Sequence, residues 1–264
     1  MTSPILLTGG TGTLGRLMMP LLRDAGCSVR VLSRHSHESG DDEFVVGDLD
    51  SGAGVEAALA GVETVVHCAG SAKGDEVKAQ TLVRAASRAG VQHLVYISVV
   101  GAERVPVVSR IDRMMFGYFA SKRAAERVVE DSGLAWTTLR ASQFHDLALM
   151  TAVHMAKLPV IPVPAGMRFQ PVDAREVAAR LVELALCPPA GLVADIAGPR
   201  IYGMDELLLS YLTASHRRRL LIPFRLAGGA ARAIRAGANL APEWAVGRRT
   251  WEDFLAERLG AGAR

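Results

Sequence analysis

The 264-residue chain is half hydrophobic, which is enough for one large α/β domain or for one domain with an appended lobe. Its 30 basic and 27 acidic residues leave a formal net charge of +3, so the chain as a whole has no nucleic-acid signature. No run approaches the roughly 18 consecutive apolar residues of a membrane span, and the first expected strand leaves no room for a signal peptide before it.

The three cysteines, Cys27, Cys68 and Cys187, are scattered and show no C-x-x-C spacing. An odd and scattered count is typical of reduced thiols that serve as small buried side chains. We therefore expect a cytoplasmic protein with no membrane and no nucleic-acid partner. No pattern in the sequence indicates an oligomeric state.

A glycine-rich turn follows the first expected strand, Ile5 to Leu7. The glycines Gly9, Gly10, Gly12 and Gly15 match the G-x-G-x-x-G spacing of dinucleotide sites. In such a site the first two glycines allow the tight turn, Gly12 lets the backbone approach a pyrophosphate, and Gly15 lets the next helix pack closely on the sheet. The N–H groups and the dipole of that helix then favour phosphate.

The expected helix after the glycines runs from Leu14 to Ala25 and stops at Gly26. Pro20 lies inside it, and we expect a kink there because proline lacks the backbone N–H that the helix needs.

Further strands and helices then alternate along the chain. Strands are expected at 28–32, 43–46, 62–67, 94–97 and 136–139, and helices at 55–60, 75–89 and 116–131, with an irregular segment at 104–116. This alternation is typical of a Rossmann-type α/β fold, a doubly wound parallel sheet with strand order 3-2-1-4-5-6. Ligands of such folds bind beyond the carboxyl ends of the strands.

The alternation fades after residue 142, so we expect a single NAD(P)-binding domain over 1–264, with a Rossmann core at 1–142 and a small substrate lobe at 143–264. Three prolines in Leu158 to Pro164 exclude a central strand there. In this part, helices are expected at 173–186, 204–214, 226–236 and 250–259, and a strand at 192–196.

The end of the second strand indicates which cofactor binds. NAD sites place an acidic residue about 20 residues past the glycines, whereas NADP sites use arginine for the 2′-phosphate. This chain has Ser33 and Arg34 there, with no acid before Glu38, and Arg16 lies beside the glycine motif. We expect NADP(H) in preference to NAD(H); the alternative is that both arginines are simply exposed.

Tyr118 and Lys122 lie four residues apart on an expected helix and therefore share one face. A neighbouring ammonium lowers the pKa of a phenol, so that Tyr118 can exchange a proton with a substrate oxygen. Ser98, directly after the fifth expected strand, is positioned to hold the same oxygen. The alternative is that Lys122 forms an exposed pair with Glu126.

These motifs together resemble the atypical short-chain dehydrogenases/reductases, in particular the NmrA-like NAD(P)H-binding branch. The resemblance rests on Thr8-Gly-Gly-Thr-Gly-Thr-Leu-Gly15, on Tyr-Ile-Ser98, on the Tyr118/Lys122 pair and on the segment 138–144. It implies a cofactor site that includes the loop residues Thr8, Thr11, Thr13 and Leu14. It also implies Asp48 near adenine, Ala69, Gly70 and Lys122 near the ribose, and Ser142, Gln143 and Phe144 near nicotinamide. Leu49 and Cys68 are further expected cofactor residues.

Our functional prediction is an NADPH-dependent oxidoreductase that reduces a carbonyl or quinone, with Tyr118, Lys122 and Ser98 as catalytic residues. The resemblance leaves one alternative, a non-catalytic NADP(H)-binding redox sensor that docks a protein partner. Phe144, Met150, Met155 and Phe169 suggest an apolar substrate cavity. Gln143 and His145 have the alternative role of capping the sixth strand.

Other classes find no support in the sequence. The seven histidines show no metal-ligand spacing, and no G-x-S-x-G motif of an α/β-hydrolase occurs. We interpret the cluster Arg217-Arg218-Arg219 as a solvated turn, with contact to an anionic partner as the alternative.

Overall fold

The computed structural model describes residues 3–37, 42–70 and 74–260. Contacts divide the chain into two compact units. The first unit comprises residues 1–98, 117–140 and 175–194, and the second comprises 99–116, 141–174 and 195–264. The chain passes between the units more than once, so neither unit is one continuous stretch.

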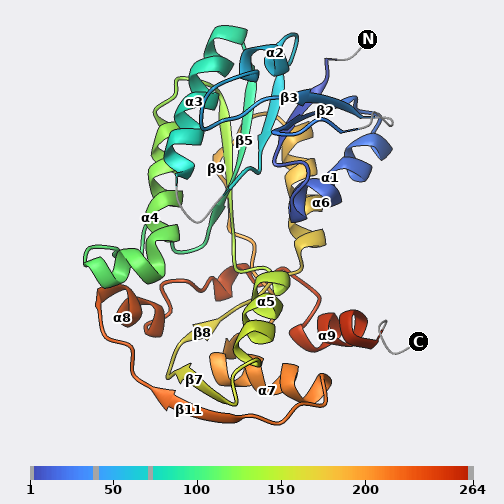
Figure 1. Ribbon diagram of the computed structural model, residues 1–264. Coiled ribbons are helices and arrows are strands. Elements are labelled where there is room, and N and C mark those ends of the chain that lie inside the picture. The colour runs from blue at the N-terminus through green and yellow to red at the C-terminus, as the bar shows by residue number, and fades with distance from the viewer. Residues whose placement is uncertain (1–2, 38–41, 71–73, 261–264) are drawn as a thin grey trace. The chain divides into compact units, whose positions relative to one another are not determined.

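A parallel sheet forms the centre of the first unit (Figure 1). Within the described residues its strand order is β3-β2-β1-β4-β5-β6-β9, which confirms the predicted order 3-2-1-4-5-6 and adds a seventh strand. The strands are β1 (Ile5–Thr8), β2 (Val29–Ser33), β3 (Glu43–Val46), β4 (Thr64–His67), β5 (His93–Val99), β6 (Trp136–Ala141) and β9 (Gly191–Leu192).

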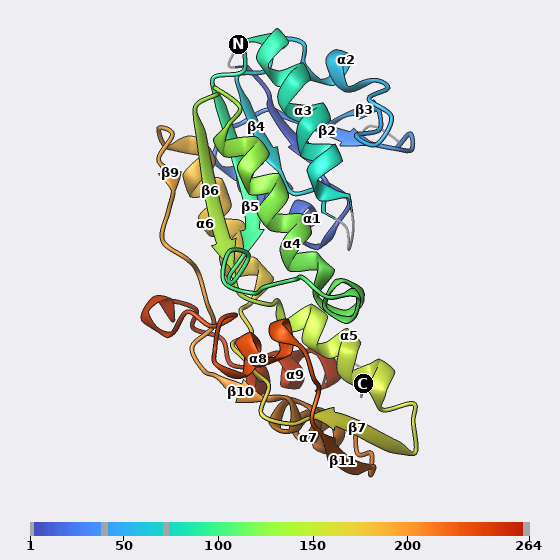
Figure 2. The same cartoon turned by 90° about the vertical axis from the view of Figure 1, so that its left-hand side faces the viewer.

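Helices cover both faces of this sheet (Figures 1 and 2). The helices α2 (Val55–Leu59), α3 (Asp75–Ala89) and α4 (Arg110–Glu130) lie on one face, and α1 (Thr13–Asp24) and α6 (Ala174–Leu186) lie on the other. Because successive residues of a strand point to opposite faces, strands buried on both sides read as continuous apolar runs. Thus Leu6 packs into the core beneath α2 and α3, while its neighbour Leu7 is equally buried.

The second unit contains mostly helices and two small sheets. Its helices are α5 (His145–Met155), α7 (Met204–Ala214), α8 (Gly229–Arg235), the 3₁₀ turn η1 (Pro242–Trp244) and α9 (Trp251–Gly260). The strands β8 (Arg168–Phe169) and β10 (Tyr202–Gly203) pair antiparallel, and β7 (Val160–Pro164) and β11 (Leu220–Phe224) pair parallel.

One local expectation needs correction. The helix α4 starts at Arg110 and not at 116, because Ser109 and Asp112 form a reciprocal cap in which each backbone N–H donates to the other side chain. The helix α1 contains Pro20, and the kink expected there stays a prediction. The segment with three prolines forms a strand, β7, in a two-stranded sheet where each strand has an edge without a ladder partner, so the prediction that it is not a central strand is confirmed.

The described residues lack two kinds of feature. No helix in this part of the chain is long and apolar enough to cross a membrane. Likewise, its His, Cys, Asp and Glu side chains form no group of three or more that could hold a metal ion.

Candidate functional site

The glycine loop after β1 is packed so tightly that side chains would clash. Gly9 has φ +73°, and a Cβ there would lie 2.7 Å from the backbone N of Ala69. A Cβ on Gly15 would lie 2.3 Å from the Cα of Gly10, which shows how closely α1 approaches the loop. Contacts this short require glycine at both positions. The loop backbone is thereby left uncovered beside the ends of β1 and β4.

A pocket of about 380 Å³ lies at the carboxyl ends of the first four strands of the sheet. It brings together most of the cofactor residues expected in this unit. They are Thr8, Gly9, Thr11, Gly12, Ser33, Arg34, Asp48, Leu49, Cys68, Ala69 and Gly70. Of the other expected residues, Gly10, Thr13, Leu14 and Gly15 belong to the loop and to the first turns of α1, outside the lining. Size, position and uncovered glycine backbone all fit a dinucleotide.

Several lining residues were missed by the sequence analysis, among them His35, His37, Asp50 and Lys78. His37 Nε2 lies 2.9 Å from the Ser33 hydroxyl, and Lys78 pairs with Asp50 at 3.5 Å. These residues follow β2 or β3 or lie on the first turn of α3, and this position could have identified them as pocket residues. Ligands of this fold bind at the ends of the strands.

Arg34 directly follows β2 and is exposed on the rim of this pocket. It makes no ion pair with any residue that the structure describes. Arg16 is also exposed but does not line the pocket, and Glu38 lies outside the described residues. Arg34 is therefore the arginine of this rim whose guanidinium is available for an anion.

His67 links the glycine loop to the neighbouring strand. Its Nδ1 lies 2.7 Å from the Thr8 hydroxyl oxygen, which also accepts a hydrogen bond from the backbone N of Ala69. Burial lowers the pKa of His67 to about 3, so the ring is neutral at physiological pH. Burial also raises the pKa of the adjacent Cys68 thiol to about 12, which makes this thiol an unreactive part of the pocket wall.

Lys122 is buried at the Gly70 end of the pocket. Its Nζ lies 3.1 Å from Asp75 Oδ2 and 3.1 Å from the carbonyl oxygen of Ile97. A Cβ on Gly70 would lie 3.1 Å from the same Nζ. Burial alone would lower the pKa of Lys122, but the adjacent Asp75 carboxylate raises it, so the pKa lies above the ordinary value and the ammonium stays charged.

The tyrosines beside Lys122 are Tyr96 and Tyr118, with ring centres 5.0 and 5.8 Å from Nζ. We predicted that Lys122 lowers the pKa of Tyr118. The charge of Lys122 alone does lower it, but the net shift of this pKa is upward, so the prediction is wrong overall. Although 38% of Tyr118 is exposed, partial desolvation outweighs the ammonium and raises the pKa of its hydroxyl. The hydroxyl therefore keeps its proton at neutral pH.

Glu126 does not pair with Lys122, so the alternative of an exposed pair is wrong. It is fully buried and forms a two-pronged ion pair with Arg140 of β6, with both N–O distances 2.8 Å, and a third contact with Arg123. Burial opposes its ionisation, yet Arg140 and Ser98 keep the pKa of Glu126 below the ordinary value. Ser98 is itself buried beside Glu126, where its Oγ makes no well-formed hydrogen bond.

The expected nicotinamide residues Ser142, Gln143 and Phe144 belong to the second unit. The Ser142 hydroxyl donates to the carbonyl oxygen of Gln170 at 2.5 Å. Gln143 lines an apolar pocket of about 190 Å³, and its buried Oε1 has no hydrogen-bond partner among the described residues. Phe144 bridges to Val172 just before α5.

His145 does not cap the sixth strand with its side chain. It is fully buried, its ring nitrogens make no well-formed hydrogen bond with the residues that the structure describes, and the ring packs against Phe254 at 5.1 Å and Trp251 at 6.0 Å. Desolvation lowers its pKa to about 4, so it is a neutral core residue.

The sheet order and the glycine-lined pocket at the strand ends define a Rossmann-type dinucleotide-binding protein. Residues 9–185 match the NAD(P)H-binding family model. The chain therefore belongs to the NAD(P)H-binding family, as the resemblance in its motifs indicated.

Two curated relatives are reductases. The (4-alkanoyl-5-oxo-2,5-dihydrofuran-3-yl)methyl phosphate reductase of Streptomyces griseus is 32% identical over 180 residues, which cover 66% of this chain and 60% of that enzyme. The NAD(P)H azoreductase of Xenophilus azovorans is 27% identical over 221 residues, 81% of this chain and 74% of that enzyme. The match thus spans less than two thirds of the Streptomyces reductase.

Solved structures share the fold. The NADPH-dependent quinone oxidoreductase of Escherichia coli in complex with NADPH superposes with a TM-score of 0.78 at 17% identity, covering 96% of this chain and 99% of that one. The triphenylmethane reductase of Citrobacter sp. gives a TM-score of 0.76 at 18% identity, covering 97% and 99%.

Proposed function

We propose that the protein is an NADPH-dependent reductase of an apolar carbonyl or quinone compound. Support comes from the family, from the reductase names of the two curated relatives described above, and from a protonated tyrosine beside a buried, charged lysine. The last of these observations carries the proposal, because a cofactor site alone does not require an acid-base group.

In the proposed site the glycine loop and the first turn of α1 bind the pyrophosphate, and Arg34 binds the 2′-phosphate that distinguishes NADPH from NADH. Lys122, beside Gly70, holds the nicotinamide ribose. When bound, the cofactor supplies a hydride. No residue of the chain has to change its redox state.

The chain itself supplies the proton. The phenol of Tyr118 is protonated at neutral pH and, in this proposal, donates a hydrogen bond and then the proton to the substrate oxygen. The Lys122 ammonium stabilises the phenolate that results, because an adjacent positive charge favours it. Ser98 remains the proposed orienting group for that oxygen, and this role requires its buried hydroxyl to donate to the substrate in place of Glu126.

An apolar pocket beside Gln143, within the second unit, matches the apolar character that we propose for the substrate. Its walls come from α5, α7 and β8, with Gln143 as a polar group inside. Of the residues expected to form an apolar cavity, Phe169 lines it, whereas Phe144, Met150 and Met155 do not. A pocket with apolar walls and one amide favours an aromatic or alkyl compound with a single polar group.

The first test is NADPH oxidation with a panel of quinones, ketones, aldehydes and azo compounds, comparing wild type with Tyr118→Phe. We expect kcat to fall about 100-fold or more, while the Kd for NADPH stays unchanged. Tyr211→Phe is a matched control, because it removes a hydroxyl from a buried tyrosine of α7 and should leave kcat unchanged.

Two outcomes would contradict this mechanism. Turnover that survives Tyr118→Phe would assign the proton to another donor or to water. Tight NADPH binding without turnover of any compound would instead favour the sensor function.

A further inference from the structure

Two segments of the second unit contain basic residues but no Asp or Glu. From residue 207 to 242 the sequence has six arginines and no Asp or Glu, and from 147 to 172 it has Lys157 and Arg168 and again no acid. The chain as a whole is nearly balanced, at 30 basic and 27 acidic residues. The two segments contain β11 and β7, which pair with each other, so this bias is brought together in space (Figure 2).

The sheet of β7 and β11 exposes an apolar face. Register pairs Leu220 with Val160 and Ile222 with Pro162. Partners in a parallel pair point to the same side, and all four residues are exposed, with Leu220 at 61% and Ile222 at 48%. Phe224, two residues further on, is 39% exposed and extends the row. We call these five residues the apolar face.

On the opposite side of the same sheet the residues of β7 are buried, whereas on β11 Leu221 is half-buried and Pro223 is exposed. Ile161 and Val163 of β7 are 0% and 4% exposed and pack into the core formed with α7 and α9. The alternation of β7 therefore fixes which side of this strand is exposed. Contiguous exposed apolar surface of this kind marks an interaction site.

Arginines lie at both ends of the apolar face. Arg217, Arg218 and Arg219 precede β11, and Arg225 follows it, roughly 20 Å away at the rise of a strand. Arg225 lines a pocket of about 650 Å³ together with Arg232 and Arg235 of α8.

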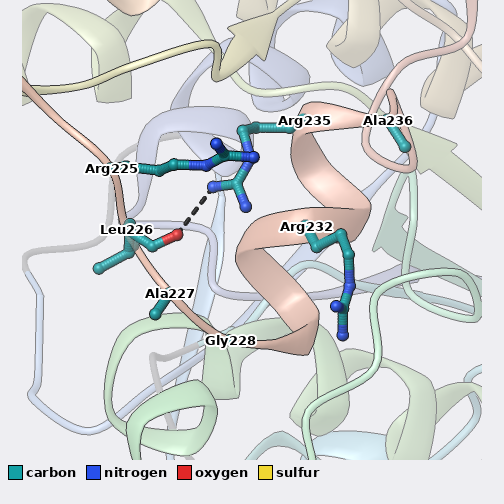
Figure 3. A pocket seen from close by; sticks show the side chains of 7 residues that line it. All are labelled: Arg225, Leu226, Ala227, Gly228, Arg232, Arg235 and Ala236. Carbon is teal, nitrogen blue, oxygen red and sulfur yellow. Dashed lines mark hydrogen bonds between the residues drawn. The ribbon is translucent and has the colours of Figure 1, made fainter.

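Figure 3 shows the side chains of Arg225 and Arg235 pointing toward one another, with Arg235 held by a 2.8 Å hydrogen bond to the carbonyl oxygen of Leu226. None of the arginines at either end has a carboxylate partner among the residues that the structure describes. Two guanidinium groups that converge without a counter-ion form a site for an anion such as phosphate.

We infer that the apolar face and the arginines beside it dock the protein on the surface of an anionic lipid bilayer. In this arrangement the apolar face enters the boundary between headgroups and acyl chains, and the arginines bind lipid phosphates on either side. This inference departs from the sequence-based expectation of no membrane partner, which rested on the lack of an apolar run long enough to span a bilayer.

Charge and backbone argue against the other occupants. A second copy on this face would bring its own arginines against these, with no acid in either segment to compensate. Pairing through a strand edge is opposed by Pro162, Pro164 and Pro223, which lack the N–H donor. A nucleic acid would use the arginines but would leave Leu220 and Ile222 against phosphate and water.

The test is sedimentation of the full-length protein with vesicles, and it requires no turnover. We expect binding to vesicles that contain phosphatidylserine, and at least tenfold weaker binding to pure phosphatidylcholine. Arg225→Gln should weaken binding about fivefold, and Leu220→Ser by a similar factor. As matched controls, Arg84→Gln on α3 and Leu209→Ser on α7, each an exposed residue outside the face, should bind as the wild type does.

Several results would overturn the inference. Equal sedimentation with both kinds of vesicle, or no sedimentation with either, would exclude anionic lipid as the partner. Loss through Arg225→Gln without any effect of Leu220→Ser would leave only nonspecific charge attraction. A dimer in light scattering that Leu220→Ser dissolves, without vesicle binding, would identify the face as a contact between copies.

Discussion

At the scale of single residues, the surroundings of Lys122 explain how a charged amine is tolerated in the core of the first unit. Its side chain is 4% exposed, and that of Asp75 is 1% exposed. An unpaired charge at this depth would be strongly destabilising, whereas the pair compensates most of the cost of desolvation. Asp75 opens α3, and Lys122 lies on α4, so the ion pair also joins two helices.

The ion pair gives a prediction about stability. Asp75→Asn removes the negative partner and leaves the ammonium buried, so the free energy of unfolding should fall by about 3 kcal/mol or more. Urea denaturation followed by circular dichroism measures this difference.

A double variant provides the control. Asp75→Asn combined with Lys122→Met removes both charges at similar volume and should recover most of the lost stability. If the double variant is less stable than Asp75→Asn alone, the ion pair does not dominate this site.

The sequence was informative about which residues gather at the cofactor pocket but not about how the charges around Tyr118 pair. Helix spacing placed Lys122 and Glu126 on one face, and both do lie on the sheet side of α4. The acid that pairs with Lys122 is Asp75, 47 positions earlier in a different helix, and no local pattern predicts such a contact. Likewise, the raised pKa of Tyr118 results from burial, which depends on tertiary packing.

At the scale of elements, the first half of the chain was predictable because each element has a local signal. The bounds of α3, Asp75 to Ala89, agree with its acidic start and the glycine at its end. The later elements are harder, since β8, β9 and β10 have two residues each and exist only through their partners. β11 was missed because its apolar run contains Pro223, and only pairing with β7 makes it a strand.

The contact between the glycine loop and α1 gives a prediction at this scale. Gly15→Ala places a methyl group 2.3 Å from the Cα of Gly10, so α1 must shift and the free energy of unfolding should fall by about 2 kcal/mol. Because the loop moves with the helix, NADPH affinity should fall as well. Thermal or urea denaturation and NADPH titration measure the two effects.

Gly117→Ala is the matched control within a helix. A Cβ at Gly117 in α4 meets nothing within 4 Å, so alanine should stabilise the protein by about 0.5–1 kcal/mol. Equal effects of the two substitutions would show that close packing at Gly15 does not limit the position of α1.

At the scale of the whole molecule, the family and the fold agree with those predicted from the sequence. The choice between NADPH and NADH depends on a small part of the molecule, the rim of the cofactor pocket. The family model covers both cofactors in its description, and the curated azoreductase is named for NAD(P)H. Arg34 provides the physical basis for a preference, because it is exposed on that rim without an ion-pair partner in the described part of the chain.

The most direct measurement is a fluorescence titration of the wild-type protein and of Arg34→Gln with NADPH and with NADH, with Arg84→Gln as control. We predict that wild type and control bind NADPH at least tenfold more tightly than NADH, because a charged hydrogen bond to the 2′-phosphate contributes about 1.5–3 kcal/mol. Arg34→Gln should weaken NADPH binding by that factor and leave NADH binding unchanged. Equal affinity of the wild type for the two cofactors, or binding of neither, would contradict the account.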